Sequence, residues 1–385
     1  MRLNPVLTGL SPYHAGPPVT ELRSRYKLDH VARLSANESP LGPFPQVIEA
    51  LHGALDDLNR YPDGGCTQLR DAIAESLGLT RDNLVIGNGS CELLMLLAEA
   101  FLNRELHAVF PQPSFVLYKS IAISREAAYD AVDLPALDYD LEAFLAVVRE
   151  NTSLIIVCNP NNPTGSYVEP QLLRPFLDRV PKDILVVLDE AYGEFCTSPA
   201  YEDSTAWIEE YSNLMILRTF SKIYGLASMR VGYGIARPEV IQAFDKVRQP
   251  FNVNHLSQIA ALESYGHPEL MMERRCYLAS ERERMGAGLR ALGIAYHPSE
   301  ANFLLVDITN LAIPGPDVPQ ALLERGIMTR SGYAMGCPGW IRVTIGEAGD
   351  NDFFLQGIEE LCHPLSKPVM HPANGLDAEA LSPES

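Results

Sequence analysis

The chain has 385 residues, of which 46% are hydrophobic and 21% are charged, which is enough for a large core and more than one domain. The formal net charge of −19 argues against a nucleic-acid partner, because nucleic acids select for basic patches. No apolar run approaches the roughly 18–20 residues of a membrane span. The N-terminus lacks a signal-peptide core, so we expect a cytoplasmic protein.

The seven cysteines are scattered along the chain without a CxxC pair and without a cluster that includes histidines. Isolated thiols of this kind are more often small core residues than metal ligands or disulfide partners. We therefore expect no metal site.

Two regions of regular structure follow an N-terminal arm. Residues 1–45 are rich in proline, glycine and polar groups and predict an extended arm with a short helix near Glu21–Tyr26. From residue 46 to residue 255, apolar runs of strand length alternate with helical stretches, which predicts an α/β domain with a mostly parallel sheet. The expected strands are Leu84–Ile86, Ala108–Phe110, Leu154–Cys158, Leu185–Leu188, Leu214–Leu217 and Val231–Ile235.

The character of the sequence changes after about Leu256. One long helical segment, Leu256–Arg290, precedes shorter strands at Asn302–Val306 and Trp340–Ile345. This pattern predicts a smaller α+β domain over residues 256–365. The last segment, 366–385, is rich in Pro, Ser, Asp and Glu, and we expect it to be disordered.

The first polar group at an expected strand end is a glycine-rich turn. Leu84–Ile86 leads into Gly89, Ser90 and Cys91, where a helix should begin. A turn of this kind presents free backbone N–H groups and the positive end of a helix dipole to an anion. A purely structural turn with a serine cap is an equally simple interpretation of this segment alone.

Two further expected strands end in polar side chains. Leu154–Cys158 runs into a loop with two prolines and a glycine, in which Asn162 is held rigidly. Leu185–Leu188 is followed by Asp189 and, three residues later, by Tyr192. A carboxylate at the end of an apolar strand costs several kcal/mol unless it has a partner. A protonated heterocyclic nitrogen would be such a partner.

The fourth strand end carries a lysine. Leu214–Leu217 leads into Thr219, Ser221 and Lys222, with Arg230 eight positions after the lysine. Burial and a nearby cation lower the pKa of a lysine and free its amine to form an imine. The two hydroxyls and the arginine are natural phosphate ligands. Together, these strand ends predict a site for a phosphorylated, protonated aromatic aldehyde.

These motifs resemble those of the fold-type I, class I/II aminotransferases that depend on pyridoxal 5′-phosphate (PLP). The resemblance rests on the loop Asn161–Gly165, on Asp189–Tyr192 and on Ser221-Lys222 with Arg230, and it covers about residues 10–362. It implies the PLP-dependent transferase fold type I, a large PLP-binding domain, and a homodimer with shared active sites.

Within that group the chain is most similar to histidinol-phosphate aminotransferases. The segments that carry this similarity are Leu10–Gly16, Leu34–Pro43, Arg60–Asp63, Gly326–Arg330 and Ile341–Gly346. The chain departs from the usual pattern where Ser39 stands in place of the commoner asparagine. The segment after Arg330 leaves the side-chain pocket undecided.

The resemblance assigns roles to particular residues. Lys222 would carry the Schiff base and move the proton, and Asp189 would pair with the pyridinium nitrogen. The other expected cofactor contacts are the phosphate ligands Gly89, Ser90, Cys91, Thr219, Ser221 and Arg230, the stacking ring of Phe115, the ring-oxygen partners Asn162 and Tyr192, and Tyr61 from the other subunit.

The expected substrate residues are Tyr13, Asn37, Asn162, Arg330 and Arg342. Two arginines fit either a carboxylate or a phosphate, because the planar guanidinium matches both anions. The resemblance therefore implies exchange between histidinol phosphate with 2-oxoglutarate and imidazole-acetol phosphate with glutamate, as in histidine biosynthesis. An aromatic or secondary-pathway aminotransferase and a decarboxylase of a phosphorylated amino acid are the alternatives. A transcription regulator would need a basic module ahead of this domain, which the first 30 or so residues do not provide.

Overall fold

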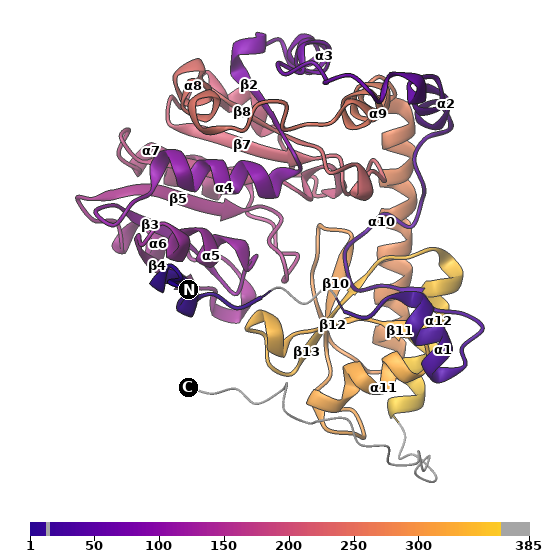
Figure 1. Cartoon of the computed structure of the whole chain (residues 1–385). Helices are drawn as coiled ribbons and strands as arrows, with labels where there is room; N and C mark the ends of the chain where they lie inside the picture. The colour runs from indigo at the N-terminus through magenta and orange to yellow at the C-terminus, as the bar shows by residue number, and fades with distance from the viewer. Residues whose placement is uncertain (13–15, 363–385) are drawn as a thin grey trace.

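The computed structural model describes residues 1–12 and 16–362, and the expected disordered tail, 366–385, lies outside them. The two larger of the three sheets, with seven and four strands, lie toward the two ends of a long helix, α10 (Pro268–Ala291) (Figure 1). No helix in these ranges is long and apolar enough to cross a membrane.

The larger sheet has seven strands in the order β2-β8-β7-β6-β5-β3-β4. All its neighbouring pairs are parallel except the two that involve β8, which is antiparallel to β7 and to β2. The expectation of an α/β fold with a mostly parallel sheet is confirmed. The strands are β2 (Leu84–Gly87), β3 (His107–Gln112), β4 (Ala128–Asp133), β5 (Thr152–Cys158), β6 (Leu185–Asp189), β7 (Leu214–Thr219) and β8 (Gly232–Ala236).

The central strands are apolar throughout because both faces of the sheet are covered. Along β5, Leu154 and Ile156 pack into one apolar cluster, whereas Ile155 and Val157 pack into the other. All four side chains are fully buried. Burial of one such side chain contributes roughly 1.5–3 kcal/mol, so these strands hold the sheet together.

The helices of this part of the chain lie on both sides of the sheet (Figure 1). Several begin with proline at the first helical position, where its missing N–H costs nothing. The helices are α2 (Pro45–Gly53), α3 (Thr67–Leu77), α4 (Ser90–Phe101), α5 (Leu117–Ser124), α6 (Leu141–Ala146), α7 (Pro170–Arg179), α8 (Pro238–Val247) and α9 (His255–Tyr265).

The smaller sheet has four strands in the order β12-β13-β10-β9. The arm joins this part of the molecule, because β1 (Ala32–Arg33) pairs in parallel with β11 (Ile327–Met328). The remaining elements are α1 (Val19–Tyr26), β9 (Tyr296–His297), β10 (Phe303–Asp307), α11 (Val318–Glu324), β12 (Arg330–Ser331), β13 (Trp340–Thr344) and α12 (Ala348–Cys362).

The prediction of one helical segment over Leu256–Arg290 was wrong, because two helices, α9 and α10, occupy it. The break falls between Gly266, which caps the C-terminal end of α9, and Pro268, which begins α10. Proline lacks the N–H that would continue the helix, and its ring clashes with the preceding turn.

Parallel pairing brings functional strand ends together. β5, β6 and β7 run in the same direction, so their carboxyl ends meet at one edge of the sheet. β8 runs the other way and starts at this edge with Gly232, which pairs with the last residue of β2, Gly87. The glycine-rich turn, Asn162, Asp189 and Lys222 all follow strands that end here.

The close packing of the backbone around Gly232 allows a test of how β7, β8 and the start of α4 are arranged. A Cβ atom there would lie 2.7 Å from the backbone nitrogen of Ser90 and 2.9 Å from the carbonyl oxygen of Arg218. Because backbone cannot rotate away, we expect Gly232→Ala to lower the free energy of unfolding by about 1–3 kcal/mol in urea titration. Gly53→Ala is the control, since a Cβ at Gly53 meets nothing within 4 Å. Equal stability of the two variants would contradict this packing.

Candidate active site

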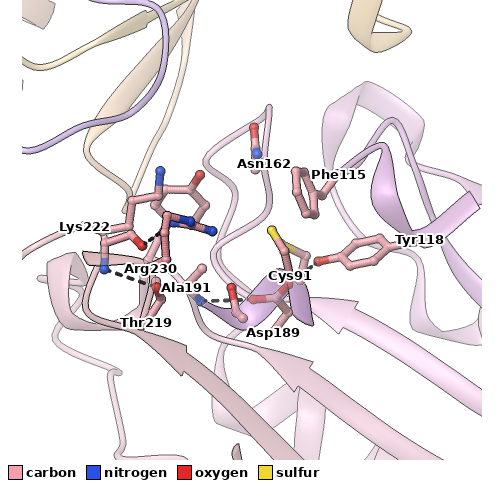
Figure 2. Close-up of a pocket in the computed structure, with 13 residues that line it drawn as sticks. Cys91, Phe115, Tyr118, Asn162, Asp189, Ala191, Thr219, Lys222 and Arg230 are labelled. Carbon is pink, nitrogen blue, oxygen red and sulfur yellow. Dashed lines mark hydrogen bonds between the residues drawn. The ribbon is translucent and has the colours of Figure 1, made fainter. Parts of the chain in front are cut away.

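A cavity opens at the sheet edge where the strand ends meet, and Figure 2 shows the side chains around it. Its lining comes from the ends of β5, β6 and β7, the start of α4 and the segment before and within α5. The lining residues are Ser90, Cys91, Phe115, Tyr118, Cys158, Asn162, Asp189, Ala191, Tyr192, Thr219, Ser221, Lys222 and Arg230.

One end of the cavity is built to receive an anion. Helix α4 begins at Ser90, directly after Gly89, so its first backbone N–H groups have no partner within the helix. Arg230 reaches over the turn and donates from Nη1 to Ser221 Oγ at 3.2 Å. Gly89 has φ +77°, and a Cβ there would lie 2.6 Å from Arg230 Nη2. Only glycine permits both the turn and this approach.

Asp189 lies at the other end of the cavity, fully covered at the end of β6. Its Oδ2 accepts a hydrogen bond of 2.7 Å from the hydroxyl of Tyr118, and its Oδ1 accepts one of 3.2 Å from the backbone N–H of Ala191. Burial raises the pKa of Asp189, while these two donors oppose the shift. The carboxylate is therefore costly to leave without a cationic partner.

The next residue faces a different environment. Glu190 accepts two hydrogen bonds from the guanidinium of Arg218, and both side chains are buried. Of these two adjacent carboxylates, Asp189 thus faces the cavity while Glu190 is neutralised away from it.

The amine of Lys222 belongs to the cavity lining and comes from the segment after β7. Its Nζ donates to the carbonyl oxygen of Ala36 at 3.2 Å and lies 5.6 Å from the centre of the Tyr192 ring. Burial, and then the positive charge of Arg342, lower the pKa of Lys222 to about 8. A substantial fraction of this amine is neutral near physiological pH, as a nucleophile requires.

The arm closes one side of the site. Asn37 donates from Nδ2 to the Tyr192 hydroxyl at 2.9 Å. Its backbone N–H donates to Thr344 Oγ1 at 2.9 Å, which ties the arm to β13. Asn37 has φ +53°, a left-handed conformation that asparagine tolerates better than most residues. Asn37 is also buried, at 1% exposure, so this contact is fixed.

Arg342 joins the small sheet to the cavity. It donates from Nη1 to Asn162 Oδ1 at 2.5 Å and from Nη2 to the carbonyl oxygen of Ser35 at 2.7 Å. The guanidinium carbon lies 5.3 Å from the centre of the Phe303 ring. Arg330 is the antiparallel partner of Arg342 across β12 and β13, so both arginines lie on the same face of the sheet. Neither Arg330 nor Arg342 is among the residues that line the cavity itself, and Arg342 reaches it through its bond to Asn162.

Of three further expected site residues, one lines the cavity, one lies away from it and one is outside the described residues. Phe115 lines the cavity, with its ring nearly perpendicular to that of Tyr118 at 5.8 Å. Tyr61 is 83% exposed and stacks on Phe251, so it does not reach the cavity of its own chain. Tyr13 lies outside the described residues.

Sequence reasoning missed Tyr118, Cys158 and Ala191 as lining residues. Cys158 ends β5 and pairs with Asp189, so the strand-end pattern was a usable signal for it. Tyr118 lies in α5, three residues after Phe115, and this helical spacing to a candidate stacking ring was its only signal.

Comparison with known proteins shows the family to which the chain belongs. The family profile of aminotransferase class I and II matches residues 29–358. A histidinol-phosphate aminotransferase of Geobacillus thermodenitrificans is 41% identical over 94% of this chain and 98% of its own length. One of Halalkalibacterium halodurans is 39% identical over 94% of this chain and 97% of its own length.

Among solved structures, histidinol-phosphate aminotransferase from Sinorhizobium meliloti in complex with pyridoxal-5′-phosphate has a TM-score of 0.85 and 29% identity. That match covers 94% of this chain and 97% of the other. The family match spans most of the chain and contains every strand end that lines the cavity. The chain is therefore a member of the class I and II aminotransferases.

Proposed function

We propose that this enzyme transfers the amino group of histidinol phosphate to 2-oxoglutarate, which yields imidazole-acetol phosphate and glutamate. The observation that carries the proposal is that three features meet in one cavity. They are the anion cradle formed by the start of α4 with Ser221 and Arg230, the buried carboxylate of Asp189, and the lysine with a lowered pKa, Lys222. The choice of substrate is supported by the relatives at 39–41% identity, whose lengths the chain matches almost completely.

The residues present fit PLP. The N–H groups at the start of α4, with Thr219, Ser221 and Arg230, would hold its phosphate. Asp189 would meet the ring nitrogen and supply the negative charge that keeps it protonated. Phe115 would stack on the ring face. When bound, PLP supplies the electron sink that stabilises the carbanion of the amino donor.

The remaining cavity residues handle the ring oxygen and the proton. The hydroxyl of Tyr192 and the amide of Asn162 would hydrogen-bond the ring oxygen. Lys222 would bind the cofactor through Nζ and, once released by substrate, would move the proton that leaves the donor carbon. The pKa of about 8 suits this task, because such an amine both accepts and returns a proton near neutral pH.

Arg342 and Arg330 would bind the anionic end of each substrate. The two guanidinium groups lie on one face of the small sheet, and a phosphate dianion matches a pair of positive charges. The carboxylates of glutamate and 2-oxoglutarate would use the same groups in the other half-reaction. Asn37 and Tyr13 would complete this part of the pocket.

We also propose that the enzyme works as a homodimer with shared active sites. Tyr61 and Phe251 stack on each other and are exposed, and the apolar side chains of Leu55 and Leu58, which precede Tyr61 by a few residues in the sequence, are exposed as well. Covering this surface with a second copy would bury it and bring Tyr61 toward the phosphate end of the partner's cavity.

The substrate is tested by single-turnover absorbance of the PLP-loaded enzyme with each amino donor alone. We expect histidinol phosphate to convert the cofactor with a kcat/KM at least about 100-fold above that of phenylalanine or tyrosine. The two amino acids offer the arginines a carboxylate with one negative charge, whereas histidinol phosphate offers them a phosphate dianion. A preference for an aromatic amino acid would overturn the proposed substrate. Release of CO₂ from an amino-acid donor would indicate a decarboxylase instead.

The role of Arg342 is tested by Arg342→Ala. Because the guanidinium would contact substrate and not cofactor, we expect kcat/KM for histidinol phosphate to fall about 100-fold while the dissociation constant of PLP changes less than about threefold. Arg325→Ala is the control, since Arg325 pairs with Glu360 at the surface. An equal loss of PLP affinity would show that Arg342 serves the cofactor instead.

A further inference from the structure

Tyr118 is a buried residue at the cavity to which the proposed reaction assigns no role. Its ring is 1% exposed, and its hydroxyl donates to Asp189 Oδ2 at 2.7 Å. Burial, and then the charge of Asp189, raise the pKa of Tyr118 well above its ordinary value. The hydroxyl therefore keeps its proton and remains a donor across the physiological range.

Few groups hold Asp189 in place, so the hydrogen bond from Tyr118 is important for its position. The titratable groups that interact electrostatically with the carboxylate come from several elements: Tyr118 from α5, Cys158 from β5, Cys91 from α4, Lys222 after β7, Tyr192 after β6, and Tyr139. Burial keeps the Cys158 thiol protonated, and its Sγ donates to the carbonyl oxygen of Pro160. The donors to Asp189 within the described chain are thus the Ala191 N–H and the Tyr118 hydroxyl, and the Tyr118 bond is shorter by 0.5 Å.

We propose that Tyr118 is a positioning residue that fixes the orientation and the charge of Asp189 toward the cofactor ring. This inference rests on the proposed function, because it concerns the carboxylate that would meet the ring nitrogen. The Tyr118 hydroxyl holds Oδ2 and the Ala191 N–H holds Oδ1, so both oxygens of the carboxylate that lines the cavity are held in place (Figure 2). The edge-to-face contact of Tyr118 with Phe115 further links this carboxylate to the ring that would stack on the cofactor.

The charge follows from the same hydrogen bond. A donor to a carboxylate stabilises its anionic form and makes it less basic. Without that donor, Asp189 would draw the shared proton away from the ring nitrogen, and the ring would lose positive charge. A ring with less positive charge is a weaker electron sink. It also repels a proton less strongly from the nitrogen that joins Lys222 to the cofactor, so that nitrogen holds its proton more tightly. Loss of the hydroxyl should therefore raise the pKa of that nitrogen.

Tyr139 offers a matched control from the same region. Its hydroxyl donates to the carbonyl oxygen of Cys158 at 2.8 Å and accepts from the Cys158 N–H at 3.0 Å. Cys158 is the sheet partner of Asp189, so both tyrosines brace the same pair of strand ends. Tyr139 makes no hydrogen bond to Asp189 itself in the described structure.

The experiment compares Tyr118→Phe with Tyr139→Phe in PLP-loaded enzyme, with the absorbance of the lysine-bound cofactor titrated against pH. For Tyr118→Phe we expect the titration midpoint to rise by about one pH unit, and kcat to fall about tenfold with KM within about threefold. For Tyr139→Phe we expect the midpoint to stay within about 0.3 units, because a merely structural hydroxyl does not act on the ring.

A double-variant cycle shows whether Tyr118 acts through Asp189. In an Asp189→Asn background, Tyr118→Phe should shift the midpoint no further, because the acceptor's charge is already absent. The proposal is overturned if Tyr118→Phe leaves the wild-type midpoint unchanged, or if its shift is the same in both backgrounds. Absence of bound PLP in the wild type would instead refute the proposed function, so the two failures are distinct.

Discussion

The carboxylate of Asp189, buried at the end of a fully apolar strand, is the interaction on which the rest of the site depends. Burial of a charge costs several kcal/mol, and the hydrogen bonds from Tyr118 and Ala191 offset only part of this cost. The neighbouring Glu190 is neutralised by Arg218, whereas no residue in the described part of the chain forms an ion pair with Asp189. A cationic ring nitrogen would complete it, and the nearby anion cradle and low-pKa lysine suit the other two parts of PLP.

The sheet explains why these groups meet. Apolar residues on both faces of β5, β6 and β7 fix three parallel strands side by side, so their polar continuations emerge at one edge. The antiparallel strand β8 enters at that edge with a glycine, which lets the α4 turn approach. The arm and the small sheet then cover the opening through Asn37 and Arg342.

Sequence alone predicted the strand ends well, because continuous apolar runs followed by Asn162, Asp189 and Lys222 carry a strong local signal. It did not predict β4, whose mostly half-exposed residues lack an apolar run. It merged α9 and α10, since helical patterning continues across Gly266 and Pro268. The contact of Asn37 with Tyr192 joins residues 155 positions apart, and only the folded chain places such pairs together.

The central claim is that Lys222 is the residue to which PLP becomes attached within this cavity. Borohydride reduction of PLP-loaded protein, followed by peptide mass analysis, tests it most directly. We predict one phosphopyridoxyl group per chain, located on Lys222 and absent from Lys222→Ala. A label on another lysine, or an unlabelled wild type that shows no cofactor absorbance, would contradict the account.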